Sequence, residues 1–83
     1  MADEGTDIHI EELKVAASSK LVDVTLKDSE IRNSYNLIIL SIVKGDGTML
    51  FNPSADTRIG ASDTVVAVGS QESLVKVGEF LNP

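Results

Sequence analysis

The residues that could carry out chemistry are few, and they do not form a catalytic constellation. His9 is the single histidine and stands beside Glu11 and Glu12, with no cysteine in the chain to share a metal ion with it. A surface or edge position is the preferred interpretation of His9, and a metal-binding or general-base role is the alternative. None of the serines lies in the Gly-x-Ser-x-Gly context that exposes a hydrolase nucleophile.

Two further patterns resemble ligand sites at first sight. Asp56, Asp63 and Glu72 lack the spacing of an EF-hand calcium loop, and roles in turns and at a helix start explain them better. The Gly-Asp-Gly sequence at residues 45–47 resembles a phosphate cradle, but a strand pattern follows it instead of a helix, so a hairpin turn is expected. The sequence therefore predicts no enzyme, with neither a catalytic nor a metal site.

Arg32 is the one basic residue between Lys27 and Lys44, and it has two interpretations. It could stabilise the carbonyl groups at the end of a short helix, where cations are favourable. It could instead hold two phosphate oxygens at a subunit boundary with its planar guanidinium. Tyr35, the only tyrosine, is either a core residue with an outward hydroxyl or a stacking surface.

The elements that must position these residues follow a polar, acidic stretch. Residues 1–9 are expected to be a disordered leader, and residues 10–83 are expected to form one domain. The first strand begins near Ile10, where the alternation of apolar residues changes phase before Leu13 and indicates either a strand start or a bulge.

Two helices are expected. Residues 25–28 fit a capping box, which predicts a short helix over residues 26–35. Ser70 caps a last helix that ends at residues 82–83. The apolar residues that give this last helix its helical spacing are Leu74, Val77 and Leu81.

Three more strands lie between the helices. Residues 37–44 are almost continuously apolar, which indicates a strand covered on both faces. Residues 48–52 return as its hairpin partner, and Pro53 ends the pairing because proline lacks a backbone donor. Residues 64–68 form the last strand, which Gly69 ends.

The resulting order, β-α-β-β-β-α, predicts an α+β fold with a mainly antiparallel four-stranded sheet and two helices on one face. The opposite face of the apolar strand has no element in this chain to cover it. An uncovered apolar sheet face is typical of a protein–protein contact, so the pattern predicts a homodimer.

Composition excludes several classes of function. The chain has 83 residues, no cysteine and a net charge of −6, and its basic residues are scattered, which argues against nucleic-acid binding. The longest apolar run, residues 37–43, is far shorter than the roughly 20 residues that span a bilayer. The acidic start at residues 1–4 does not fit a signal peptide, so a cytoplasmic location is expected.

Four segments, in order and spacing, resemble the C-terminal lobe of potassium-conductance regulators, the RCK-C or TrkA-C domain. They are residues 19–26 (SKLVDVTL), 31–36 (IRNSYN), 52–57 (NPSADT) and 62–69 (SDTVVAVG). The Asn-Pro-Ser-x-Asp-Thr segment and its distance from the Val-rich strand are the most specific part of the resemblance.

Three glycines of the family pattern are replaced in this chain, by Asp23, Asn36 and Ser62. Asp and Asn tolerate the left-handed backbone conformation better than most residues. The turns at residues 23 and 36 are therefore expected to persist.

The resemblance implies a site. Similar domains pair into dimers that regulate potassium channels and transporters, and they occur also in cation–proton antiporters and anion permeases. In members that bind cyclic di-AMP, the ligand lies in the dimer cleft, an Arg matching Arg32 contacts phosphate, and apolar residues matching Leu26 and Ile39 line the pocket. Those members carry an Asn where this chain has Ile38, which cannot donate hydrogen bonds. The expected ligand-binding residues are Leu26, Arg32, Ile38 and Ile39.

Two hypotheses follow. The first is a cytoplasmic regulatory domain of a potassium channel or ion transporter that forms a homodimer and senses a small, nucleotide-type ligand at the dimer cleft. The second is a dimerisation module without a small-molecule ligand, in an antiporter or an anion permease. The sequence does not identify a cofactor.

Overall fold

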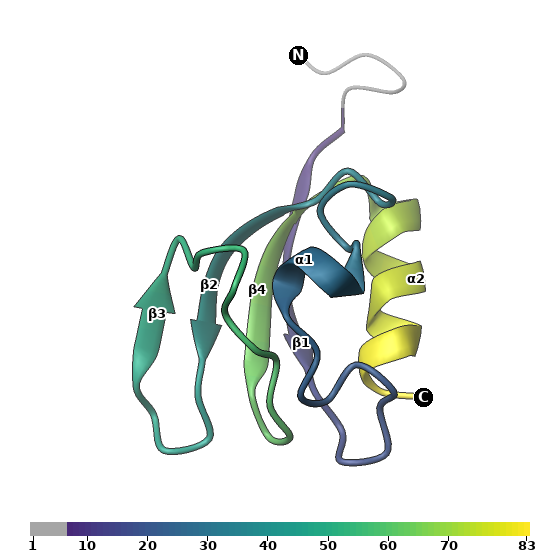
Figure 1. Cartoon of the computed structure of the whole chain (residues 1–83). Coiled ribbons are helices and arrows are strands. Elements are labelled where there is room, and N and C mark those ends of the chain that lie inside the picture. The colour runs from purple at the N-terminus through teal and green to yellow at the C-terminus, as the bar shows by residue number, and fades with distance from the viewer. Residues whose placement is uncertain (1–6) are drawn as a thin grey trace.

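Four antiparallel strands form one sheet in the order β1-β4-β2-β3, and two helices pack against it (Figure 1). The computed structural model describes residues 7–83. The prediction of an α+β fold with a mainly antiparallel four-stranded sheet and two helices on one face is confirmed. The elements are β1 (His9–Lys14), α1 (Leu26–Ser29), β2 (Ile38–Val43), β3 (Met49–Phe51), β4 (Thr64–Gly69) and α2 (Gln71–Leu81).

Most of the expected leader, residues 1–6, lies outside the described residues, and β1 begins at His9. Within residues 7–83, no helix has the length and apolar content needed to cross a membrane.

A single apolar core lies between the sheet and the two helices. The helix α2 begins as predicted, because the Ser70 hydroxyl accepts a hydrogen bond from the Ser73 N–H at 3.2 Å. Its apolar stripe is buried against β4 and β1, also as predicted. The fully buried residues of this core include Leu26, Ile31, Ile39, Ile42, Ile59, Val65, Val77 and Leu81.

The helix α1 is only one turn long, so the prediction that it reaches Tyr35 is wrong. Its start is as expected, because Thr25 accepts a hydrogen bond from the Asp28 N–H at 3.1 Å. Its end is set by Glu30, which adopts the left-handed conformation (φ 60°) and so stops helical hydrogen bonding. Residues 31–35 continue as turns, and Arg32 therefore lies beyond the helix.

The bulge lies in β2 and not in β1. Strand β1 pairs with β4 without interruption from His9 to Lys14, which places Ile10 and Leu13 on opposite faces of the sheet. The pairing of β2 with β4 shifts between Ile39 and Ser41. This extra residue lets β2 present Ile39 to the core while Ser41 points to the other side.

The tight turns expected from the sequence are present. Gly47 has φ 91° in the hairpin between β2 and β3. Asp23, Asn36 and Ser62, which replace glycines of the family pattern, all adopt positive φ, at 68°, 54° and 70°. The backbone expectation at residues 23 and 36 is confirmed, and it extends to residue 62.

The face of the sheet opposite the helices is apolar, and no element formed by residues 7–83 covers it; we call it the open face. Ile10 and Ile38 both pair with Val68, and Phe51 pairs with Ser41, so these side chains share one side. Ile38 is 63% exposed and Phe51 is 75% exposed. The prediction that β2 is covered on both faces therefore fails within a single chain, because only the helix side is buried.

Candidate functional site

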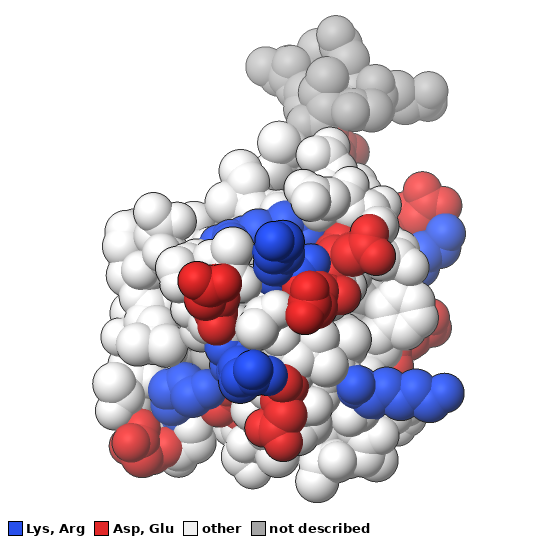
Figure 2. Space-filling model, in the orientation of Figure 1, with Lys and Arg blue, Asp and Glu red and all other residues white. Residues whose placement is uncertain are grey.

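Charged side chains of both signs are interspersed on the face that carries α1 and α2 (Figure 2). Basic groups there stand close to acidic ones, and no continuous basic surface is formed on this face. The surface over β3 is largely free of charge in the same view. On this face, recognition of a ligand would rest on single charged groups and not on a charged surface.

The first such group is Arg32, which lies in a cavity of about 460 Å³ that we call the arginine pocket. The Arg32 Nη2 donates a hydrogen bond to the Pro53 carbonyl oxygen at 2.7 Å, which fixes the side chain across the gap between two loops. The pocket is lined by Arg32, residues 37–39 and residues 52–55.

The contact with Pro53 bears on the helix-end interpretation of Arg32. The helix-end interpretation is wrong, since the guanidinium bonds to a carbonyl 21 residues away and not to those of α1. A guanidinium has five N–H donors, and the bond to Pro53 engages one of its nitrogens. Arg32 is thus positioned and oriented at a cavity in a manner suited to an anionic ligand.

The structure brings three of the four expected site residues together. Arg32, Ile38 and Ile39 all line the arginine pocket. Ile38 belongs to the pocket and to the open face at once, whereas Ile39 is buried on the helix side. Leu26 is 1% exposed in the core and does not line the pocket, because α1 turns it toward the sheet.

One wall of the pocket, residues 52–55, was not among the expected site residues. Asn52 has φ 48° and donates its N–H to the Leu40 carbonyl at 2.7 Å, so the chain leaves β3 and folds back over Arg32. A signal for this wall was present in the sequence, since Asn-Pro-Ser is the most specific part of the family resemblance.

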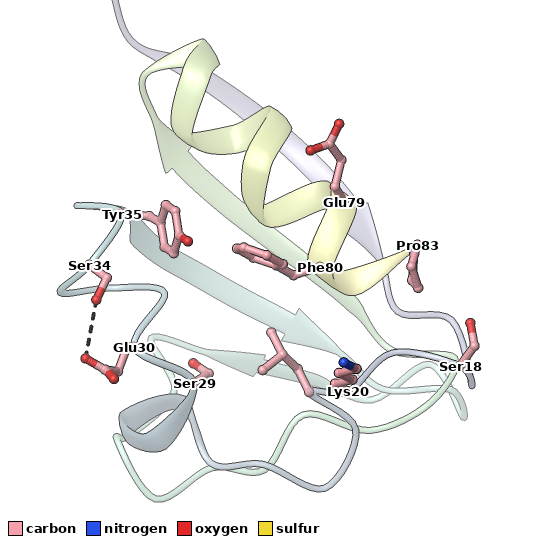
Figure 3. Close-up of a pocket in the computed structure, with 10 residues that line it drawn as sticks. Ser18, Lys20, Ser29, Glu30, Ser34, Tyr35, Glu79, Phe80 and Pro83 are labelled. Atoms are coloured by element: carbon pink, nitrogen blue, oxygen red, sulfur yellow. Dashed lines mark hydrogen bonds between the residues drawn. The ribbon is translucent and has the colours of Figure 1, made fainter.

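A second and larger cavity, of about 690 Å³, lies between the turn after α1 and the end of α2 (Figure 3). Tyr35 and Phe80 face each other in it edge to face, with ring centroids 5.5 Å apart and planes at 64°. We call it the aromatic pocket. Tyr35 is half-buried and packs against the core, so it is a core residue that also forms a surface. The lining residues are Ser18, Lys20, Leu21, Ser29, Glu30, Ser34, Tyr35, Glu79, Phe80 and Pro83.

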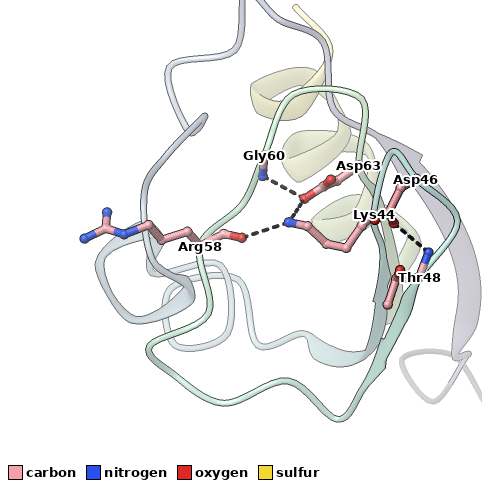
Figure 4. A network of polar contacts seen from close by, with 6 residues as sticks. All are labelled: Lys44, Asp46, Thr48, Arg58, Gly60 and Asp63. Atoms are coloured by element: carbon pink, nitrogen blue, oxygen red, sulfur yellow. Dashed lines mark hydrogen bonds and ion pairs between the residues drawn. The ribbon is translucent and has the colours of Figure 1, made fainter.

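The most buried carboxylate, Asp63, has a structural role (Figure 4). It accepts hydrogen bonds from Lys44 Nζ at 2.5 Å and from the Gly60 N–H at 2.7 Å. Asp46 lies nearby in the hairpin, where hydrogen bonds from Thr48 lower the pKa of its exposed carboxyl group. These contacts join the hairpin to the loop before β4.

His9 is exposed on β1 and lies with Glu11 beside Gln71 of α2. In the part of the chain from residue 7 onward, no group of three His, Cys, Asp or Glu residues is placed to hold a metal ion.

The sequence matches the TrkA-C domain family over residues 10–82. One relative, the K(+)/H(+) antiporter subunit KhtT of Bacillus subtilis (strain 168), is 33% identical over 78 residues, which make up 93% of this chain and 47% of KhtT. The chain therefore spans about half the length of this relative.

Solved structures with the same fold include two with a bound nucleotide. The RCK C domain of the potassium transport protein KtrA, in complex with cyclic di-AMP, has a TM-score of 0.76 and 23% identity, covering 88% of this chain and 82% of that one. The RCK_C domain dimer of S. agalactiae BusR, also with cyclic di-AMP, has a TM-score of 0.79 and 16% identity, covering 88% and 95%.

BusR has also been solved with its busAB-promotor DNA, and there the match has the same TM-score and identity but covers only 35% of the BusR chain. The match over residues 10–82, together with the shared fold, identifies the family. This chain belongs to the TrkA-C domain family.

Proposed function

We propose that this chain is the cytoplasmic regulatory domain of a potassium channel or ion transporter, and that it forms a homodimer that senses a nucleotide-type ligand. The family membership and the antiporter subunit KhtT among its relatives support a transport system. The net charge of −6 speaks against nucleic acid as a partner of this chain. BusR, which shares this fold, has been solved with DNA, and the match covers about a third of that chain, so the absence of a nucleic-acid partner stays a prediction.

The arginine pocket carries the proposal, because it places one oriented guanidinium beside an exposed apolar side chain. Arg32 offers charge-assisted hydrogen bonds to a phosphate, and Ile38 offers apolar surface to a base, while Ile39 is buried behind it. The ligand we propose is cyclic di-AMP, the molecule bound by the structurally similar domains of KtrA and BusR.

The open face supports the dimer. Ile38 joins this apolar surface to the arginine pocket, so a second copy packed on the open face would also approach the ligand. A ligand held between two copies favours the dimer geometry to which it binds best, and its differential affinity sets the size of the effect. Gating of the parent transporter would follow from this shift.

The experiment that tests the function is thermal unfolding of the purified chain with cyclic di-AMP, ATP, ADP and calcium in turn. Binding to the folded state raises stability by about 2.7 kcal/mol at a hundredfold excess of ligand over Kd. A saturable rise in Tm with cyclic di-AMP alone is the expected result, and unchanged curves with the whole panel would contradict ligand sensing.

A second candidate function is a dimerisation module that binds no small molecule. The observation that favours it is Ile38, which places an apolar side chain without donors in the pocket wall. This function predicts a stable dimer by sedimentation together with unchanged melting curves. A saturable ligand would rule it out.

A further inference from the structure

The aromatic pocket is larger than the arginine pocket and belongs to no function considered so far. Its volume of about 690 Å³ lies within the range of small-molecule sites in proteins, roughly 300–1,000 Å³. Most of its exposed lining is apolar, and polar groups from two segments stand around it. We propose that the aromatic pocket is a second ligand site, which takes a small aromatic cation and influences the arginine pocket.

The aromatic part of the ligand is indicated by Tyr35 and Phe80. Their rings meet edge to face, and Phe80 remains 45% exposed although it belongs to α2 and faces the cavity (Figure 3). An inserted flat ring would gain contacts with both side chains and with Leu21, and it would cover surface that water now contacts.

The positive charge of the ligand is indicated by the electrostatics of the lining. Glu30 and Glu79 contribute two carboxylates, and Lys20 is the single cation. Glu30 is held by the Ser34 hydroxyl, which donates to it at 3.3 Å, on the side of the cavity where Tyr35 lies. A cation over the exposed face of an aromatic ring is attracted to it as well.

The link to the arginine pocket lies in the chain that forms walls of both. Glu30, Ser34 and Tyr35 line the aromatic pocket, while Arg32 and residues 37–39 line the arginine pocket. Ile31 and Leu37, both buried in the core, anchor this segment between the two cavities. A ligand that displaces Tyr35 would act on the segment that also carries Arg32, and this part of the proposal depends on the proposed function.

The site can be tested with tryptamine as the probe and indole-3-acetate as a control, since both carry the indole ring and they differ in charge. Saturable shifts of the Tyr35 and Phe80 amide signals are expected with tryptamine in ¹H–¹⁵N spectra. Binding of indole-3-acetate is expected to be about tenfold weaker. Equal binding of both probes, or no saturation with tryptamine, would overturn the proposal.

Two variants separate the site from the fold. Phe80→Ala removes the ring and should abolish the saturable binding of tryptamine. Glu30→Gln keeps the shape of the pocket, and it should weaken the binding of tryptamine by several-fold but not the binding of indole-3-acetate. Tryptamine binding to Glu30→Gln that equals wild type, with an unchanged spectrum elsewhere, would contradict the role of charge.

The coupling is measured by titrating cyclic di-AMP with and without saturating tryptamine. Tryptamine is expected to change the Kd of cyclic di-AMP. Cyclic di-AMP must then change the Kd of tryptamine by the same factor, as linkage requires. An unchanged Kd would refute the coupling. If cyclic di-AMP fails to bind in either condition, the proposed function fails, while the tryptamine shifts still decide the aromatic pocket by themselves.

Discussion

At the scale of residues, the arginine pocket combines one oriented cation with an exposed isoleucine whose side chain has no hydrogen-bond donor. Arg32 is fixed by the Pro53 carbonyl, and Ile38 contributes only apolar surface. We infer that phosphate binding depends on Arg32 and that Ile38 limits the affinity for polar ligands.

The variant Ile38→Asn tests this inference. The amide introduces the donor that the family resemblance implies at this position, and one added hydrogen bond of about 1 kcal/mol corresponds to roughly fivefold tighter binding. Isothermal titration of cyclic di-AMP measures the change. Ile10→Asn is the matched control on the same face outside the pocket, and equal effects of both variants would show that the position of residue 38 has no special role.

A second residue-scale prediction concerns the Lys44–Asp63 pair. Asp63→Ala leaves the Gly60 N–H and the partly exposed Lys44 ammonium without their buried partner, and it should lower the free energy of unfolding by about 1–3 kcal/mol. Urea denaturation checks this loss. Asp46→Ala removes an exposed carboxylate from the same region, and it should lower the unfolding free energy by less than Asp63→Ala does; similar losses would contradict the role of burial.

The sequence predicted part of the site at this scale. The family resemblance predicts Arg32, Ile38 and Ile39 at one site, and all three line the arginine pocket. The family resemblance predicts Leu26 in the pocket as well. The sequence does not show in which direction a one-turn helix points its first residue. Residues 52–55 join the site through the hydrogen bond from Arg32 to the Pro53 carbonyl. These two residues are 21 positions apart, so the pattern of neighbouring residues does not predict their contact.

At the scale of elements, the strands and α2 were predictable from apolar spacing, whereas α1 was not. A capping residue marks a helix start, but the end of α1 depends on Glu30 in a left-handed conformation that glutamate rarely adopts. The bulge in β2 was equally hidden, because the continuous apolar run of residues 37–43 gives no alternation from which to read a register shift.

Gly78 in α2 provides an element-scale prediction. A Cβ at this position would meet only Leu13 Cδ2, at 3.6 Å, which is an ordinary contact. Gly78→Ala should therefore stabilise the chain by about 0.5–1 kcal/mol, because alanine gains helix propensity and loses unfolded-state entropy. Thermal unfolding measures the gain.

Gly69→Ala is the comparison for this prediction. A Cβ at residue 69 would overlap Leu37 Cδ2, so this variant should lose about 1–3 kcal/mol. If Gly78→Ala also destabilises the chain, then close packing requires the glycine in α2, and the position does not tolerate a Cβ.

At the scale of the whole molecule, the sheet has one buried face and one apolar open face. Ile10, Ile38, Met49 and Phe51 are large exposed residues on that open face, and burying them against a second copy is the most direct way to remove them from water. A homodimer through the open face is therefore our prediction for the free chain.

Phe51→Glu tests the dimer by placing a charge at the most exposed apolar residue of the open face. Sedimentation velocity should give a dimer for the wild type and a monomer for the variant, with unchanged circular dichroism. Val75→Glu introduces the same charge at an exposed apolar residue of α2, on the other side of the molecule, and should remain dimeric. A wild-type monomer at all concentrations would refute the interface.

The measurement that tests the central claim most directly is isothermal titration of cyclic di-AMP into wild type, Arg32→Ala and Arg58→Ala. These are the two arginines of the chain, and each donates a hydrogen bond to a backbone carbonyl, but only Arg32 lines the pocket. We predict one ligand per two wild-type chains, unchanged binding by Arg58→Ala, and binding at least about tenfold weaker by Arg32→Ala, since a charge-assisted hydrogen bond contributes about 1.5–3 kcal/mol. No binding by the wild type, or equal binding by the two variants, would contradict a ligand-sensing site at Arg32.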